Sequence, residues 1–126
     1  MTLRHLILAM VLMAPLPAFA ITCEYTVECF EQEACQPTDF TIEIIPGDLD
    51  ELGGVTSGLA ELRDVAGTQG AHYVAAEGFT VVENRASGDD TLFRLVIGPE
   101  GASRYQLLIL EGPLAVTYHG ICVESD

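Results

Sequence analysis

Polar and apolar residues alternate along several short segments, the period expected of half-buried β-strands. Residues 22–29 put one set of side chains on the inner face, namely Cys23, Tyr25, Val27 and Cys29. Residues 38–45 point Phe40, Ile42 and Ile44 inward, and Pro46-Gly47 stops the run. Residues 114–123 alternate in the same way, with inward Leu114, Val116, Tyr118, Gly120 and Cys122. These segments predict the first, second and last strands of a sheet.

The middle of the chain is divided by turn residues. Residues 48–58 are acidic and glycine-rich and predict a loop. Residues 59–66 fit a helical stripe between a Thr56 or Ser57 cap and a Gly67 stop, and they also fit a strand, which the neighbouring strands favour. Further strands are predicted at residues 71–76, 79–84, 91–97 and 103–110. The turns between them are Glu77-Gly78, Ser87-Gly88-Asp89-Asp90, Gly98-Pro99-Glu100-Gly101 and Glu111-Gly112-Pro113.

Seven or eight short strands with frequent turns predict an all-β fold, an antiparallel meander that forms a barrel or a sandwich. The predicted elements do not alternate between strand and helix, as they would in a parallel sheet. The first and last strands share an inward cysteine, which favours a closed barrel, because closure removes exposed strand edges.

Residues 1–20 have the three parts of a cleavable signal peptide. Arg4 charges the head, an apolar run follows, and Ala18 and Ala20 are the small residues before the cleavage site. The apolar run is shorter than the roughly 20 residues that a membrane span needs, and Pro15 and Pro17 interrupt it. A lipoprotein anchored at Cys23 is a second alternative, but Thr22 fits poorly before such a cysteine. We expect a single periplasmic or secreted domain over residues 21–126.

This domain is strongly acidic. Without Arg4, four arginines face 19 carboxylates, a formal charge of −15, and the chain contains no lysine. Nucleic acid and anionic membranes are excluded as expected partners, because both require a basic surface. A basic protein, a cation or a neutral small molecule is compatible with the charge, which also serves to keep a protein in solution.

Four cysteines in an exported chain predict disulfides. They allow three pairings, and the sequence does not decide between them. We favour Cys23–Cys122, which ties the first strand to the last, together with Cys29–Cys35, which closes a short polar link. No Cys-x-x-Cys supports a redox or metal site.

Residues that could carry chemistry do not form a known motif. His72 and His119 lack the close spacing of metal ligands, and we interpret them as isolated surface histidines. Asp48-x-Asp50-Glu51 resembles a calcium loop but lacks its later carboxylate ligands. None of Ser57, Ser87 and Ser103 lies in Gly-x-Ser-x-Gly. We therefore expect neither a catalytic site, nor a metal, nor a cofactor.

The Cys23–Cys35 segment and the closing run from Gly112 to Cys122 resemble small exported bacterial proteins of unknown function. In size, charge and compartment the chain is also similar to the periplasmic C-type lysozyme inhibitors, cystine-closed β-barrels that act on a basic enzyme. Their Ser-Gly-x-x-Tyr signature has its nearest counterpart in Gly101-Ala102-Ser103-Arg104-Tyr105, where the tyrosine follows one residue too late. The likeness implies a barrel with a basic partner, without carrying over the inhibitory residues.

The sequence thus favours a non-enzymatic exported β-domain that acts by protein–protein contact with a cationic partner. The alternative is a carrier of a small apolar ligand or a divalent cation, and a third interpretation is a hydrolase that uses His119 or His72.

Overall fold

The protein is described by a computed structural model that covers residues 19–84, 91–112 and 114–125. The predicted signal peptide up to residue 18, the predicted turn at residues 87–90 and Pro113 lie outside the described residues. Eight strands follow one another along the chain: β1 (Ala20–Phe30), β2 (Gln36–Leu52), β3 (Val55–Asp64), β4 (Gly67–Ala76), β5 (Phe79–Asn84), β6 (Thr91–Ile97), β7 (Ala102–Ile109) and β8 (Leu114–Ser125).

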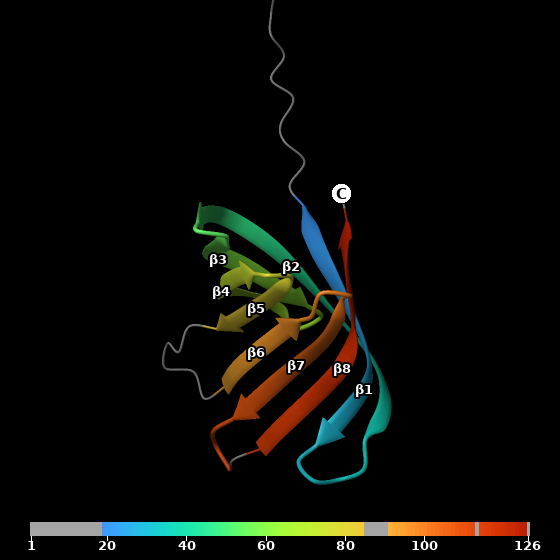
Figure 1. Ribbon diagram of the computed structural model, residues 1–126. Coiled ribbons are helices and arrows are strands. Elements are labelled where there is room, and N and C mark those ends of the chain that lie inside the picture. The colour runs from blue at the N-terminus through green and yellow to red at the C-terminus, as the bar shows by residue number, and fades with distance from the viewer. Residues whose placement is uncertain (1–18, 85–90, 113, 126) are drawn as a thin grey trace, which may run out of the picture.

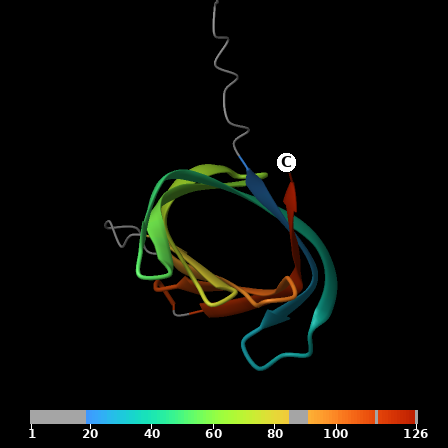
Figure 2. The same cartoon turned by 45° about the horizontal axis from the view of Figure 1, so that its top comes forward.

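The strands form a closed antiparallel barrel in which each strand pairs with the next along the chain and β8 returns to pair with β1. Figure 2 shows this ring of strands, and Figure 1 shows β1 beginning and β8 ending at the same end of the barrel. We call this the upper end. The lower end carries the β1–β2 hairpin. The predicted all-β meander and its closure as a barrel are confirmed.

Alternating residues of all eight strands fill the interior. The buried set is almost entirely apolar, as expected where side chains exclude water from a small barrel. Its fully buried members include Tyr25, Ile42, Ile44, Leu62, Val82, Leu95 and Cys23. The inward faces predicted for β2 and β8 are confirmed, because Ile42, Ile44, Val116 and Cys122 are all buried.

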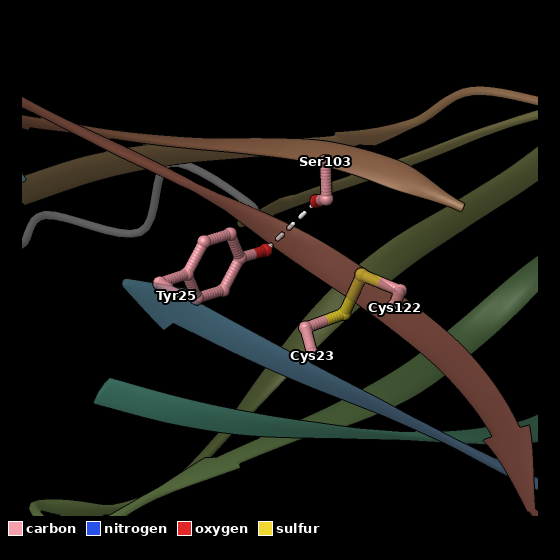
Figure 3. The surroundings of a disulfide bond; sticks show 4 residues. All are labelled: Cys23, Tyr25, Ser103 and Cys122. Carbon is pink, nitrogen blue, oxygen red and sulfur yellow. Dashed lines mark hydrogen bonds between the residues drawn. A yellow bond between two sulfur atoms is a disulfide. The ribbon is translucent and has the colours of Figure 1, made fainter. Parts of the chain in front are cut away.

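A disulfide between Cys23 and Cys122 reinforces the seam between β1 and β8. The two cysteines face one another in the strand register, and their buried side chains are joined on the inner side of this seam (Figure 3). A second disulfide joins Cys29 to Cys35 at the β1–β2 hairpin. Both predicted pairings are confirmed, and such bonds are typical of oxidising, extracytoplasmic compartments.

The inward face predicted for the second half of β1 is wrong. The register of β1 against β8 changes from Tyr25↔Gly120 to Val27↔His119, so Thr26 is an extra residue in a β-bulge. A bulge reverses the alternation of side chains beyond it. Val27 and Cys29 therefore turn outward, while Glu28 turns inward beside Tyr118.

The bulge brings the backbone of β1 very close to Gly120. A Cβ atom at residue 120 would collide with the carbonyl of Glu24 and with the backbone of Tyr25. Glycine at this position permits the close approach.

The loop predicted over residues 48–58 is also wrong. β2 continues past Pro46 through an irregularity in its register and runs to Leu52. A tight turn at Gly53 and Gly54, both with positive φ, then leads directly into β3. Two glycines that supply left-handed conformations are a hairpin signal, and the acidic residues before them lie in an exposed strand. The strand favoured for residues 59–66 is confirmed as far as Asp64.

Loss of the two disulfides should destabilise the barrel unequally. The Cys23→Ala/Cys122→Ala variant opens a loop with a sequence separation of 99, and chain entropy then lowers the free energy of unfolding by about 4–5 kcal/mol. The Cys29→Ala/Cys35→Ala variant opens a separation of only 6, for a loss of about 2 kcal/mol. Urea unfolding of both variants checks this order, and equal losses would contradict it.

Substitution of Gly120 should destabilise the seam. Gly120→Ala forces the backbones of β1 and β8 apart, at a cost of about 1–3 kcal/mol or more. Gly70→Ala is the matched control, because a Cβ at Gly70 meets nothing within 4 Å. Thermal unfolding should show a clear fall in Tm for the first variant and little change for the second. A similar Tm for both would show that β1 can move away freely.

Candidate functional site

The interior is crossed by one buried polar contact. The hydroxyls of Tyr25 on β1 and Ser103 on β7 lie 2.9 Å apart, next to the Cys23–Cys122 disulfide (Figure 3). Ser103 is the single buried polar residue among the described residues. Its hydroxyl is therefore part of the core.

An aromatic cluster fills the barrel around and below Tyr25. Neighbouring ring centroids lie 5.0–6.3 Å apart, within the range of favourable tilted and edge-to-face contacts. The cluster contains Tyr25, Phe40, Phe93, Tyr105 and Tyr118. These rings occupy the space that an apolar ligand would need.

Two carboxylates approach these rings. Burial raises the pKa of Tyr118, and the negative charge of Glu28 raises it further. Burial likewise raises the pKa of Tyr105, with an added contribution from the charge of Asp64 at the end of β3. Both phenols therefore stay protonated near neutral pH beside the carboxylates.

Glu28 is the functional candidate that sequence reasoning missed. It is half-buried on the inner face of β1 at the lower end, and the Thr38 hydroxyl donates a hydrogen bond of 3.3 Å to its carboxylate. Alternation along residues 22–29 assigned it to the outer face, and only the bulge turns it inward. No signal in the sequence marks the bulge apart from Gly120, whose missing side chain makes room for it.

The β1–β2 connection forms a constrained acidic tip beside Glu28. We call residues 29–35 the cystine hairpin, because the Cys29–Cys35 disulfide clamps its base. Glu31 ties it to β8 twice: its amide donates to the Ala115 carbonyl, and its carboxylate accepts from the Ala115 amide, each at 2.9 Å. Glu33 and, on the adjoining strand, Asp39 are exposed. These acidic residues belong to the β1–β2 connection and its adjoining strand, and that connection lies at the lower end of the barrel (Figure 1). The lower end therefore carries a negative rim held in place by the disulfide.

Two of the grooves among the described residues lie on the outer faces of the strands. One of about 670 Å³ crosses β2–β4 and is lined by Ile45, Pro46, Leu59 and His72. The other, of about 700 Å³, crosses β6–β8 and is lined by Arg94, Arg104, Gln106 and His119. The two histidines predicted to be isolated are thus on the surface and in different grooves.

The remaining sequence candidates do not converge. Asp48, Asp50 and Glu51 are all exposed on β2. Asp50 and Glu51 are consecutive in the register and so point to opposite faces of the strand. Ser57 lies on β3, and Ser87 lies outside the described residues. Within the described ranges, no three His, Cys, Asp or Glu side chains lie close enough together to hold a metal ion.

Comparisons with protein-family models, with curated proteins and with solved structures find no match. In the part of the chain that the structure describes, no helix is long and apolar enough to cross a membrane.

The buried tyrosines should make the protein sensitive to alkali. Burial raises the pKa of Tyr25 from 10.0 to about 12, although the Ser103 contact opposes this shift. The folded state therefore disfavours the phenolate, so stability is intact below pH 10 and is lost as the pH rises toward 12. By pH 12 this one residue accounts for a loss of about 2 kcal/mol.

Urea unfolding at several values between pH 9 and 12 measures this loss. Tyr25→Phe removes one titrating group and should flatten the dependence. Stability that does not change with pH over this range would contradict the burial of these phenols.

Proposed function

We propose that this protein is an exported, non-enzymatic β-domain of the periplasm or extracellular space that binds a basic protein through the lower end of its barrel. The single observation that carries the proposal is Glu28, a half-buried carboxylate with no cationic partner among the described residues. An arginine or lysine of a partner protein would form an ion pair with the Glu28 carboxylate.

The surroundings of Glu28 favour a cation. Within residues 19–84, 91–112 and 114–125, the ion pairs are Arg63–Glu61 and Arg94–Glu83, both on the outer surface. The Thr38 hydroxyl donates to the Glu28 carboxylate, and the Tyr118 hydroxyl also contacts it. A carboxylate has about four acceptor positions, so room remains for further donors. A guanidinium supplies paired donors for such a carboxylate, and charge-assisted bonds of this kind are stronger than neutral ones.

The cystine hairpin extends the negative surface beyond Glu28 and should speed association with a basic protein. Glu31, Glu33 and Asp39 extend the negative field of Glu28 outward, and a field of this kind accelerates encounter with a basic protein. The disulfide and the two bonds to Ala115 hold the tip in place before binding. Less conformational entropy is then lost when a partner docks.

An inhibitor of a basic enzyme fits this description. The likeness in size, charge and cystine closure to C-type lysozyme inhibitors supports a c-type lysozyme as the first partner to try. The alternative of an interior carrier for an apolar ligand is not favoured, because the aromatic cluster occupies the lower interior.

Neutralising Glu28 should weaken binding to a basic protein. We expect Glu28→Gln, which keeps an oxygen for Thr38, to raise the Kd for c-type lysozyme about tenfold, or about 1.4 kcal/mol. Calorimetric titration at 0.15 M salt, with cytochrome c as a second basic probe, measures the change.

Glu24→Gln is the matched control, because Glu24 lies on the same strand but is exposed on the outer face. It removes the same charge and should leave the Kd almost unchanged. Equal effects of the two variants would mean that net charge alone drives association. Absence of binding to both basic proteins at low salt would refute the proposed function.

A further inference from the structure

The groove on the outer face of β6–β8 gathers positive charge on an acidic protein. The whole sequence has 5 Lys and Arg residues against 19 Asp and Glu. Two of those arginines, Arg94 and Arg104, line this groove together with His119 and Gln106. We call it the arginine groove. Three of its lining residues are small, which leaves the groove open at these positions, namely Gly98, Ala102 and Gly120.

The strand register places these groups side by side. Arg104 on β7 lies directly opposite His119 on β8, and Arg94 on β6 lies opposite Gln106. Arg94 and Arg104 are thus diagonal neighbours, about 7–8 Å apart at Cα. Two positive charges at this separation repel one another, and an anion bound between them would offset that repulsion.

The two arginines differ in how they are neutralised. Arg94 pairs with Glu83 on the adjacent strand at 3.3 Å, and both side chains are largely exposed. Arg104 makes no ion pair with any carboxylate of residues 19–84, 91–112 and 114–125. Its guanidinium is available to an anion, and its fork of donors matches a carboxylate or a phosphate.

An apolar path leads away from Arg104. In the register, Arg104 is next to Val96, Val96 is next to Val81, and Val81 is next to Val74. These three valines cross the outer face of β4–β6 in one row, and Val74 is 43% exposed. Charge at one end and an apolar row at the other form an amphiphilic surface.

We propose that the arginine groove binds a small amphiphilic anion, with its carboxylate or phosphate head on Arg104 and its apolar chain along the valine row. Val96 lines the groove beside Arg104, whereas Val81 and Val74 continue the apolar row beyond it, so the groove of about 700 Å³ receives the head group and the start of the chain. A carboxylate head is the chemistry of a fatty acid and a phosphate head that of a lipid fragment, and Arg104 accepts either.

The charge of the rest of the molecule selects against larger anions. A polyanion spans many of the surrounding carboxylates and is repelled by them. A single head group responds mainly to charges within the screening length, about 8–10 Å at physiological salt. The arginine groove therefore fits a small anion, and its face is separate from Glu28 and the cystine hairpin.

A titration followed by NMR tests the proposal. The mature protein, labelled with ¹⁵N, receives octanoate, octyl phosphate or octanol at 0.15 M salt. We expect octanoate or octyl phosphate to shift amides of β6–β8 in a saturable way and octanol to bind at least tenfold more weakly. Comparison of the two anions distinguishes a carboxylate from a phosphate ligand.

Two arginine variants locate the site. Arg104→Gln should weaken binding of the anion at least tenfold. Arg63→Gln removes the same charge from β3, where Arg63 pairs with Glu61, and should leave binding unchanged. Both substitutions are at exposed positions, and the spectra report directly whether the fold is kept.

The proposal would be overturned by no saturable shift with either anion, by equal weakening in both variants, or by binding of octanol as tight as that of the anions. If the same amides shift with protein concentration alone, a second copy of this chain covers the groove, and the proposal also fails. Because these readouts concern β6–β8, they are independent of binding to a basic protein at the lower end.

Discussion

The structure depends on the pairing of β1 with β8. This pairing converts an eight-stranded meander into a ring without free edges, and Cys23–Cys122 fixes it covalently from the inside. Each other strand pairs with its neighbour in the sequence, which requires only short turns. The closing pair joins residues about a hundred positions apart, so its formation carries the largest entropic cost of any contact in the fold.

Closure also determines what the interior can contain. Side chains fill a small barrel of this kind, and here the aromatic cluster and the disulfide share that space. The Tyr25 and Ser103 hydroxyls satisfy one another, so a polar contact can be buried without an unpaired group. Polar residues that could bind a partner are consequently found at the lower end and on the outer surface.

The sequence was sufficient for the features that rest on alternation and on turn residues. Local pattern predicted the inward faces of β2 and β8 and the strands β5 and β6, which turns delimit. The positions of the cysteines predicted the preferred disulfide pairing. The prediction from alternation failed beyond Thr26, because Thr26 is the extra residue of a β-bulge and nothing in the composition of this segment marks a bulge. The loop predicted after Pro46 was wrong for a different reason: the acidic, glycine-rich composition is typical of a loop, whereas pairing with β3 continues β2 past the irregularity.

The candidate sites were harder to predict for the same reason. Glu28 faces inward only because of the bulge, and the arginine groove exists only because the register brings Arg94, Arg104 and His119 together from three strands. Neither arrangement leaves a spacing motif in the chain. Sites of this kind depend on which residues meet across strands, and one sequence gives no measure of that.

The covalent seam has a mechanical consequence. Ala20 and Ser125 pair at the same end of the barrel, and the Cys23–Cys122 bond lies only a few residues inside them. A force that pulls these ends apart passes through the sulfur atoms and bypasses everything between, so the barrel carries almost no load. An unfoldase that translocates the chain from either end would meet a closed covalent loop, which must enter as a doubled strand or be reduced first.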